Sequence, residues 1–213
     1  MNFQSQYFTY ALFQNLKELA AQKGNQDEFE WFKLSYKAFI NHPVKDSSDL
    51  IRLIAFAYSW MPTMAKFKSK LPEDIDSLIK TFNSFSELKD LSELDRKEKE
   101  LQNIVYRLVS LINNSVVGTS KVLHFYNPAI FPIIDSRVIT GWNLLFKNNV
   151  NKTDLIIPKY VLLHKEIGIP IYLNYMKIIL CWLTTIRKEE AEVQIRDIEV
   201  LLYQLGGKQT FES

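Results

Sequence analysis

Cysteine, glycine and proline are scarce in this chain of 213 residues, which holds one, six and seven of them respectively. The lone Cys181 excludes an intramolecular disulfide, a zinc site built from cysteines alone and an iron–sulfur cluster. It is also typical of a protein in a reducing compartment. So few glycines and prolines disfavour an architecture of many strands joined by tight turns. The composition therefore favours helices.

The chain also lacks the patterns that direct a protein to a membrane. Its N-terminus carries no early basic cluster, and its first apolar residues are interrupted by polar ones, which a signal peptide does not tolerate. The apolar stretch from Ile167 to Ile186 is broken by Pro170, Asn174 and Lys177, so we interpret it as a buried helix. We expect a cytoplasmic protein without a membrane partner.

Charge is nearly balanced in total but unevenly distributed. The chain has 26 basic and 24 acidic residues, whereas residues 101–188 contain ten Lys and Arg and only three acids. The acids concentrate in residues 73–100 and 189–213. The basic middle is either a set of ordinary solvated helix faces or a surface that contacts phosphates.

The spacing of apolar residues predicts an all-α fold of about ten helices, in a single helical domain over residues 1–213. Asp46–Asp49 and Ser92–Asp95 have the form of helix starts, and Asp135 or Ser136 is expected to cap another helix. The expected helices are two within residues 7–40, then 50–58, one after Pro72, a long one over 101–112, 121–126, 136–146, and three at roughly 157–167, 170–187 and 190–205.

One segment is more specific than the rest of the chain. It runs from Val116-Val117-Gly118-Thr119-Ser120-Lys121 to Phe131-Pro132-Ile133-Ile134-Asp135. A long helix precedes it, one glycine closes a tight turn, a short helix and a proline-containing loop follow, and an aspartate opens the next helix. The segment is thus a helix-hairpin-helix followed by an acid.

This order resembles the helix-hairpin-helix DNA glycosylase superfamily, which contains endonuclease III, adenine glycosylase and 8-oxoguanine glycosylase. The resemblance covers residues 104–138, and Pro132-Ile133-Ile134-Asp135 carries it most closely. Val116 replaces the first hairpin glycine of the family, and the C-terminal cysteine cluster of several members is missing. The resemblance implies two helical lobes around a cleft, with Asp135 at its mouth and double-stranded DNA as the partner.

The resemblance implies that the protein excises a damaged or modified base by breaking its N-glycosidic bond. Positive charge builds up on the deoxyribose during this step, and the carboxylate of Asp135 would stabilise it. Counting from Gly118 places Ser120 where bifunctional members carry a lysine, which favours a monofunctional enzyme over a lyase. Lys121, one residue further, is the alternative nucleophile.

The resemblance also suggests which residues contact the DNA. The expected phosphate contacts are Val117, Gly118, Thr119, Ser120, Lys121 and Arg137, because hairpin amides and basic side chains bind a DNA backbone without reading its sequence. The candidates for a base pocket are Tyr58, Trp60, His124 and Trp142. The sequence indicates no metal site and no cofactor, except that hairpin carbonyls in this family can hold a monovalent cation.

Each of these residues has a simpler reading. Asp135 is a good N-cap whatever its chemistry, Lys121 can be a phosphate contact, and His124 can be a hydrogen-bonded structural histidine. The aromatic candidates can belong to the core. Two alternative functions also remain, namely a helix-hairpin-helix protein that binds DNA without catalysis and a helical protein-interaction module.

Overall fold

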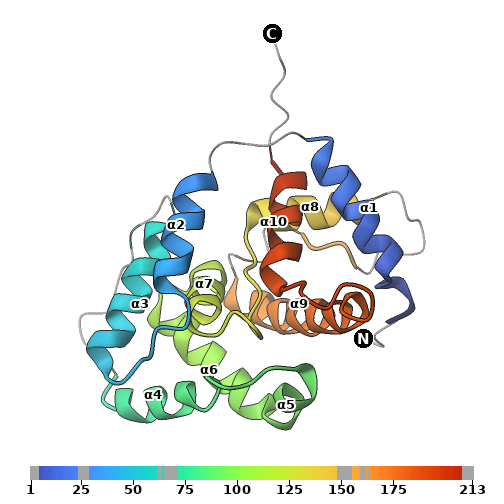
Figure 1. Ribbon diagram of the computed structural model, residues 1–213. Helices are drawn as coiled ribbons and strands as arrows, with labels where there is room; N and C mark the ends of the chain where they lie inside the picture. Colours follow the sequence, from blue (N-terminus) through green and yellow to red (C-terminus); the bar gives the residue numbers. More distant parts are fainter. Residues whose placement is uncertain are drawn as a thin grey trace.

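The computed structural model describes residues 5–23, 29–61, 64, 72–147, 155–158, 162 and 164–207. Over these residues the chain forms ten α-helices, one short 3-10 helix and no strand (Figure 1), which confirms the all-α prediction. The elements are η1 (Ser5–Tyr7), α1 (Tyr10–Ala21), α2 (Phe29–Phe39), α3 (Ser47–Ser59), α4 (Ile75–Asn83), α5 (Leu91–Arg96), α6 (Glu98–Leu111), α7 (Val116–Tyr126), α8 (Ser136–Phe146), α9 (Lys165–Ile186) and α10 (Ile195–Leu205).

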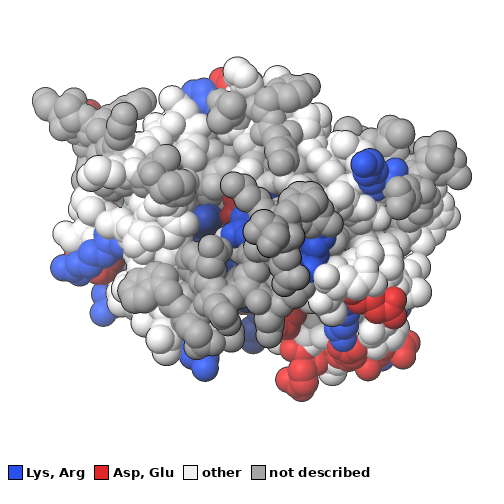
Figure 2. Space-filling model, turned by 90° about the horizontal axis from the view of Figure 1, so that it is seen from above, with Lys and Arg blue, Asp and Glu red and all other residues white. Residues whose placement is uncertain are grey.

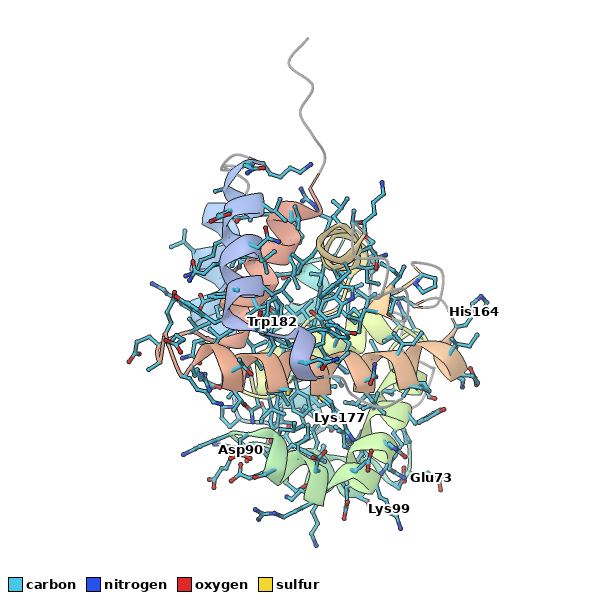
Figure 3. All side chains as sticks on the ribbon, turned by 90° about the vertical axis from the view of Figure 1, so that its right-hand side faces the viewer. Glu73, Asp90, Lys99, His164, Lys177 and Trp182 are labelled. Atoms are coloured by element: carbon cyan, nitrogen blue, oxygen red, sulfur yellow. The ribbon has the colours of Figure 1, made fainter. Side chains whose placement is uncertain are left out.

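Helix α9 runs through the middle of the molecule, with α1 and α10 on one side and α5 and α6 on the other (Figure 3). Trp182 donates a hydrogen bond from its indole to the Thr9 carbonyl, 2.9 Å away, on the first side. Lys177 pairs with Glu98 at 2.7 Å on the second. The length and apolar composition of α9 would suit a membrane span, but 56% of its apolar window is buried by other helices. Helix α9 is therefore partly buried, and its interpretation as a core helix stays a prediction.

The remaining helices form two groups (Figure 1). Helix α10 packs against α8 and α1, whereas α3 packs against α7 and α4 against α6. Helix α9 joins the two groups, because it contacts α6 and α7 as well as α1 and α10. Ten of the eleven residues of α7 are buried, and its sequence accordingly has no clear polar face.

Two glycines allow α8 and α10 to approach each other closely. A Cβ on Gly141 would lie 1.9 Å from the Leu202 carbonyl oxygen, and a Cβ on Gly206 would lie 1.9 Å from that of Arg137. Any side chain at either position would collide with backbone, which cannot move aside as the end of a side chain can. This contact fixes the start of α8 relative to α10.

Several helix boundaries differ from those expected, for identifiable reasons. Asp90 rather than Ser92 begins the helix in its region, because the Asp90 carboxylate accepts from the Glu93 amide at 2.9 Å and a separate short α5 results. Helix α9 begins at Lys165 and contains Pro170 in its second turn. The helix expected at roughly 157–167 does not begin where predicted, because 156–158 are not helical, and its residues 159–161 and 163 lie outside the described residues. Helix α10 begins at Ile195, after a turn.

The hairpin of the resemblance is built differently from the expected one. Helix α7 begins at Val116, five residues before the predicted start, with Ser115 as its N-cap. The turn before α7 lies at Asn113 and Asn114, which adopt the left-handed conformation with φ of 56° and 53°. Gly118 therefore lies within the first turn of a helix and does not close the hairpin.

Candidate functional site

The structure brings Lys121 and Asp135 together. Lys121 lies in the second turn of α7 and Asp135 is the N-cap of α8. The Lys121 Nζ is 3.7 Å from Oδ2 of Asp135 and donates a hydrogen bond to the Trp60 carbonyl oxygen, 3.2 Å away. An amine, a carboxylate and the end of α3 thus meet where the two groups of helices join.

Asp135 performs two tasks with its two carboxylate oxygens. Its Oδ1 accepts from the backbone amides of Arg137 and Val138, both at 3.0 Å, and so caps α8. Its Oδ2 faces Lys121. Because one oxygen is sufficient for capping, the second is available to a neighbouring charge. The capping role and a chemical role are therefore compatible.

Lys121 is enclosed to an extent that is unusual for a lysine. Its side chain is 9% exposed and that of Asp135 is 17% exposed. Burial lowers the pKa of the Lys121 amine, and the charge of Asp135 opposes this effect. A lowered pKa raises the fraction of unprotonated amine, which is the form that reacts as a nucleophile.

Ser120, which sequence counting placed at the catalytic position, has a structural role instead. Its hydroxyl accepts from the Ile134 amide at 3.2 Å and donates to the Val117 carbonyl at 2.8 Å. The side chain is fully buried. Ser120 thereby fixes the loop that ends at Asp135, while the next residue, Lys121, faces the carboxylate.

Most of the predicted phosphate contacts lie inside the protein. Gly118, Thr119 and Ser120 are buried in α7, and Lys121 is nearly so. The Gly118 amide is bound by the Ser115 hydroxyl at 2.9 Å, and a Cβ on Gly118 would lie 2.7 Å from the Tyr58 hydroxyl oxygen. Gly118 thus makes room for Tyr58.

Val117 and Arg137 are the predicted DNA contacts that keep part of their surface exposed. The Arg137 guanidinium lies over the Tyr203 ring, 4.2 Å from its centroid, and Nη1 donates to the Tyr203 hydroxyl at 2.5 Å. DNA contact by these two residues stays a prediction.

Helix α10 supplies two charged residues that sequence reasoning missed. Glu199 is 1% exposed and accepts a short hydrogen bond from the Ile133 amide, in the loop that leads to Asp135. Its other oxygen, Oε2, is 3.2 Å from Nη1 of Arg196. The sequence could have indicated Glu199, because it lies on the apolar face of α10 that Ile195, Ile198 and Leu202 define. A carboxylate there indicates a buried polar contact.

His124 is fully buried and uses both ring nitrogens. Nδ1 is 2.6 Å from the Phe131 carbonyl oxygen and 3.3 Å from Oε1 of Glu199. Since a carbonyl can only accept, Nδ1 carries a proton, and Nε2 is hydrogen-bonded with the Tyr36 hydroxyl, 2.9 Å away. Burial raises the pKa of Tyr36, and the charge of Glu199 raises it further, so this hydroxyl remains a donor. This arrangement is that of a structural histidine.

The aromatic candidates separate into two places. Trp142 is buried against Phe8, Phe146 and Tyr175, and its indole donates to the Leu155 carbonyl at 2.6 Å, so it belongs to the core. Tyr58 is buried beside Gly118. Trp60 is half-buried at the end of α3, next to Lys121. Trp60 is therefore the aromatic residue of this set that lies at the site.

Two further hydroxyl groups are buried near these carboxylates. Tyr172 and Tyr175 on α9 are fully enclosed, and within the described residues their hydroxyls have no hydrogen-bond partner. Burial raises the pKa of both, and the charge of Glu199 adds to this effect in each case. Asp135 acts in the same direction on Tyr175. The two phenols are therefore neutral donors behind the site.

The basic middle of the sequence is partly neutralised by the acidic segments. Arg107 pairs with Asp74 at 2.7 Å, and Lys177 lies 2.7 Å from Glu98 and 3.5 Å from Asp95. Viewed from above, Lys and Arg atoms are visible beside acidic atoms near the centre of one face (Figure 2). A uniform basic surface over the described residues does not result.

Among the residues whose placement is described, no three His, Cys, Asp or Glu side chains are grouped so that they could hold a metal ion. No protein-family model, curated protein or solved structure matches this chain. The function is therefore inferred from the contacts of Lys121 and Asp135.

Proposed function

We propose that this protein is a DNA N-glycosylase in which Lys121 and Asp135 form the reacting pair. One observation carries the proposal: an amine with a lowered pKa lies 3.7 Å from a carboxylate that is fixed at a helix N-terminus. Both residues occupy the segment on which the sequence resembles helix-hairpin-helix glycosylases. Perturbed ionisable groups that face each other are more frequent at functional sites than elsewhere.

In this proposal Lys121 is the nucleophile and Asp135 stabilises the charge that develops. The unprotonated amine attacks C1′ of the deoxyribose, and the N-glycosidic bond breaks with its electron pair on the departing base. The base takes a proton that the nitrogen releases. As the sugar ring opens, O4′ takes a proton from solvent and a protonated Schiff base forms between C1′ and the lysine. Water then releases the lysine and leaves an abasic site.

This assignment differs from the one that sequence counting favoured. Ser120 implied a monofunctional enzyme that uses water, but its hydroxyl is occupied by the backbone of Val117 and Ile134. The amine of Lys121 occupies the position beside the carboxylate. The proposal therefore includes a covalent Schiff-base intermediate on Lys121, with Asp135 in the electrostatic role that the resemblance implied.

The decisive experiment is incubation with duplex oligonucleotides that carry uracil, 8-oxoguanine, alkylated bases or bulky modified bases, followed by alkali to reveal abasic sites. We expect cleavage at one class of lesion by the native protein and none by Asp135→Asn. No cleavage of any duplex would reject catalysis and leave the DNA-binding alternative. Unchanged cleavage by Asp135→Asn would remove Asp135 from the mechanism.

A second candidate is a helical protein-interaction module. The pairing of Arg107 and Lys177 with acidic residues favours it, because charges satisfied within the chain contribute less to DNA binding. Salt dependence separates the two candidates. Binding to duplex DNA that weakens steeply with salt supports the glycosylase, and absence of binding at low salt supports the module.

A further inference from the structure

Arg196 is held more firmly than a surface arginine. It lies in the first turn of α10, where its Nη1 is 3.2 Å from Oε2 of the buried Glu199. Its guanidinium carbon is 5.1 Å from the centroid of the Tyr36 ring and 5.5 Å from that of Trp60. A carboxylate and two aromatic faces therefore fix its position, since cation–π contacts of this length are attractive.

Arg196 and Lys121 share a neighbour. The Trp60 ring lies beside the guanidinium, while the Trp60 carbonyl accepts a hydrogen bond from Lys121 Nζ. The positive charge of Arg196 also contributes to lowering the pKa of Lys121, after the larger effect of burial. The guanidinium thus lies close to the reacting pair and carries the charge that a phosphate would need.

The guanidinium retains unused hydrogen-bonding capacity. The Arg196 side chain is 24% exposed, and its one hydrogen bond within the described residues is made by Nη1. Nε and Nη2 remain as donors for a ligand. A planar guanidinium binds phosphate through two parallel hydrogen bonds, and it is most effective when it is already positioned.

We propose that Arg196 binds a phosphate group of the nucleotide whose base is removed. This inference rests on the proposed glycosylase function and adds a residue that positions the substrate. Glu199 and the rings of Tyr36 and Trp60 orient the guanidinium, and the phosphate places C1′ beside Lys121. Arg196 takes no part in bond breaking.

The test uses a duplex that contains a tetrahydrofuran analogue of an abasic site, which has no base to remove, so that binding is measured apart from catalysis. We expect Arg196→Gln to weaken binding about tenfold, as for loss of a hydrogen bond to a charged group. The slope of affinity against salt should fall by about one unit. Arg196→Lys should keep the slope but not the affinity, because an ammonium cannot bind through two parallel donors.

The matched control is Arg52→Gln, which removes the same charge from α3. The Arg52 side chain is 72% exposed and pairs with Asp49 three residues earlier, away from Lys121. We expect this variant to bind like the native protein. Thermal unfolding of every variant shows whether the fold tolerates the loss of the cation beside Glu199. If Arg196→Gln does not fold, Arg196→Lys serves as the test, because it keeps a cation beside Glu199.

The outcomes separate the two proposals. If Arg196→Gln and Arg196→Lys bind as tightly as Arg52→Gln does, Arg196 is not a phosphate contact and the glycosylase proposal stands. If the native protein binds no duplex at any salt concentration, both proposals are rejected. A loss confined to the Arg196 variants supports the inference.

Discussion

The two carboxylates near Lys121 differ in their surroundings. Glu199 within α10 is 1% exposed, and its two oxygens meet a backbone amide, a histidine and an arginine. Asp135 at the start of α8 keeps some exposed surface and uses one oxygen for capping and one toward Lys121. A fully buried acid whose oxygens are all bound within the protein supports the architecture, whereas a partly exposed acid with one oxygen toward a buried amine is suited to chemistry.

The same contrast separates α10 from α7. Helix α7 contributes the amine, whose partners are a carbonyl and a carboxylate at the ends of other helices. Helix α10 holds the surrounding segments in place. Glu199 accepts a hydrogen bond from the loop before Asp135, and the Arg196 guanidinium lies over two aromatic rings. The position of α10 against α8 should therefore control the geometry of the site without direct participation.

The largest effect should come from separating α8 and α10. Gly141→Ala places a methyl group 1.9 Å from the Leu202 carbonyl oxygen, and we expect it to lower the free energy of unfolding by about 3 kcal/mol or more. Urea denaturation measures this. Gly118→Ala is the comparison, because its nearest obstacle is the end of the Tyr58 side chain, which can move. If both variants lose the same free energy of unfolding, the close approach of α8 to α10 does not require glycine more than the contact of Gly118 with Tyr58 does.

The next effect concerns the architectural carboxylate. Glu199→Ala leaves Arg196 and the Ile133 amide without their acceptor, and we expect it to lower the free energy of unfolding by about 3 kcal/mol. Glu199→Gln keeps an oxygen that accepts from the Ile133 amide, so its free energy of unfolding should fall clearly less. If both variants unfold at the same denaturant concentration as the native protein, Glu199 has no architectural role.

Substitutions of Asp135 should lower the free energy of unfolding less than those of Glu199, and should instead abolish excision. The variants Asp135→Asn and Asp135→Ala both remove the charge beside Lys121, so their difference reports the cap: because asparagine caps helices as well as aspartate does, Asp135→Asn should be more stable than Asp135→Ala by about 1 kcal/mol. Excision should be abolished in both variants. A variant that is stable and fully active would place Asp135 with Glu199 among the architectural residues.

The smallest effect is a pH dependence of stability that arises from Lys121. Because burial lowers its pKa in the folded state, the unfolded chain binds more protons between that lowered value and the ordinary lysine pKa of about 10.4. Stability relative to Lys121→Met should therefore rise with pH across this interval and be constant below it. Denaturation of both proteins at a series of alkaline pH values tests this expectation. A difference that falls with rising pH would mean that Asp135 outweighs burial.

The sequence singled out Lys121 and Asp135, which we propose as the reacting pair, but not the residues that surround them. Asp135 was identified because a capping aspartate after Pro-Ile-Ile is a local pattern, and Lys121 followed from its place after Gly118. The choice between Ser120 and Lys121 was not local, since it depends on where α7 begins, and Ser115 sets that start five residues earlier than periodicity indicated. Apolar spacing alone cannot locate the start of a helix whose residues are almost all buried.

Arg196 and Glu199 could not be predicted in the same way. Their partners Tyr36, Trp60, His124 and Ile133 come from distant parts of the chain, and only tertiary packing brings them together. The charge count of residues 101–188 likewise did not predict that Asp74 and Glu98 pair with Arg107 and Lys177. Patterns within one helix predict its own face and its caps, but not the contacts that it makes with others.

Borohydride trapping tests whether Lys121 is a nucleophile positioned beside Asp135. The protein is incubated with a duplex containing an aldehydic abasic site in the presence of cyanoborohydride, which reduces a Schiff base to a stable bond. We predict a covalent adduct with the native protein and with Lys165→Gln, which removes a more exposed lysine at the start of α9, and none with Lys121→Gln. No adduct with the native protein, or an adduct that persists in Lys121→Gln, would show that Lys121 is not the nucleophile.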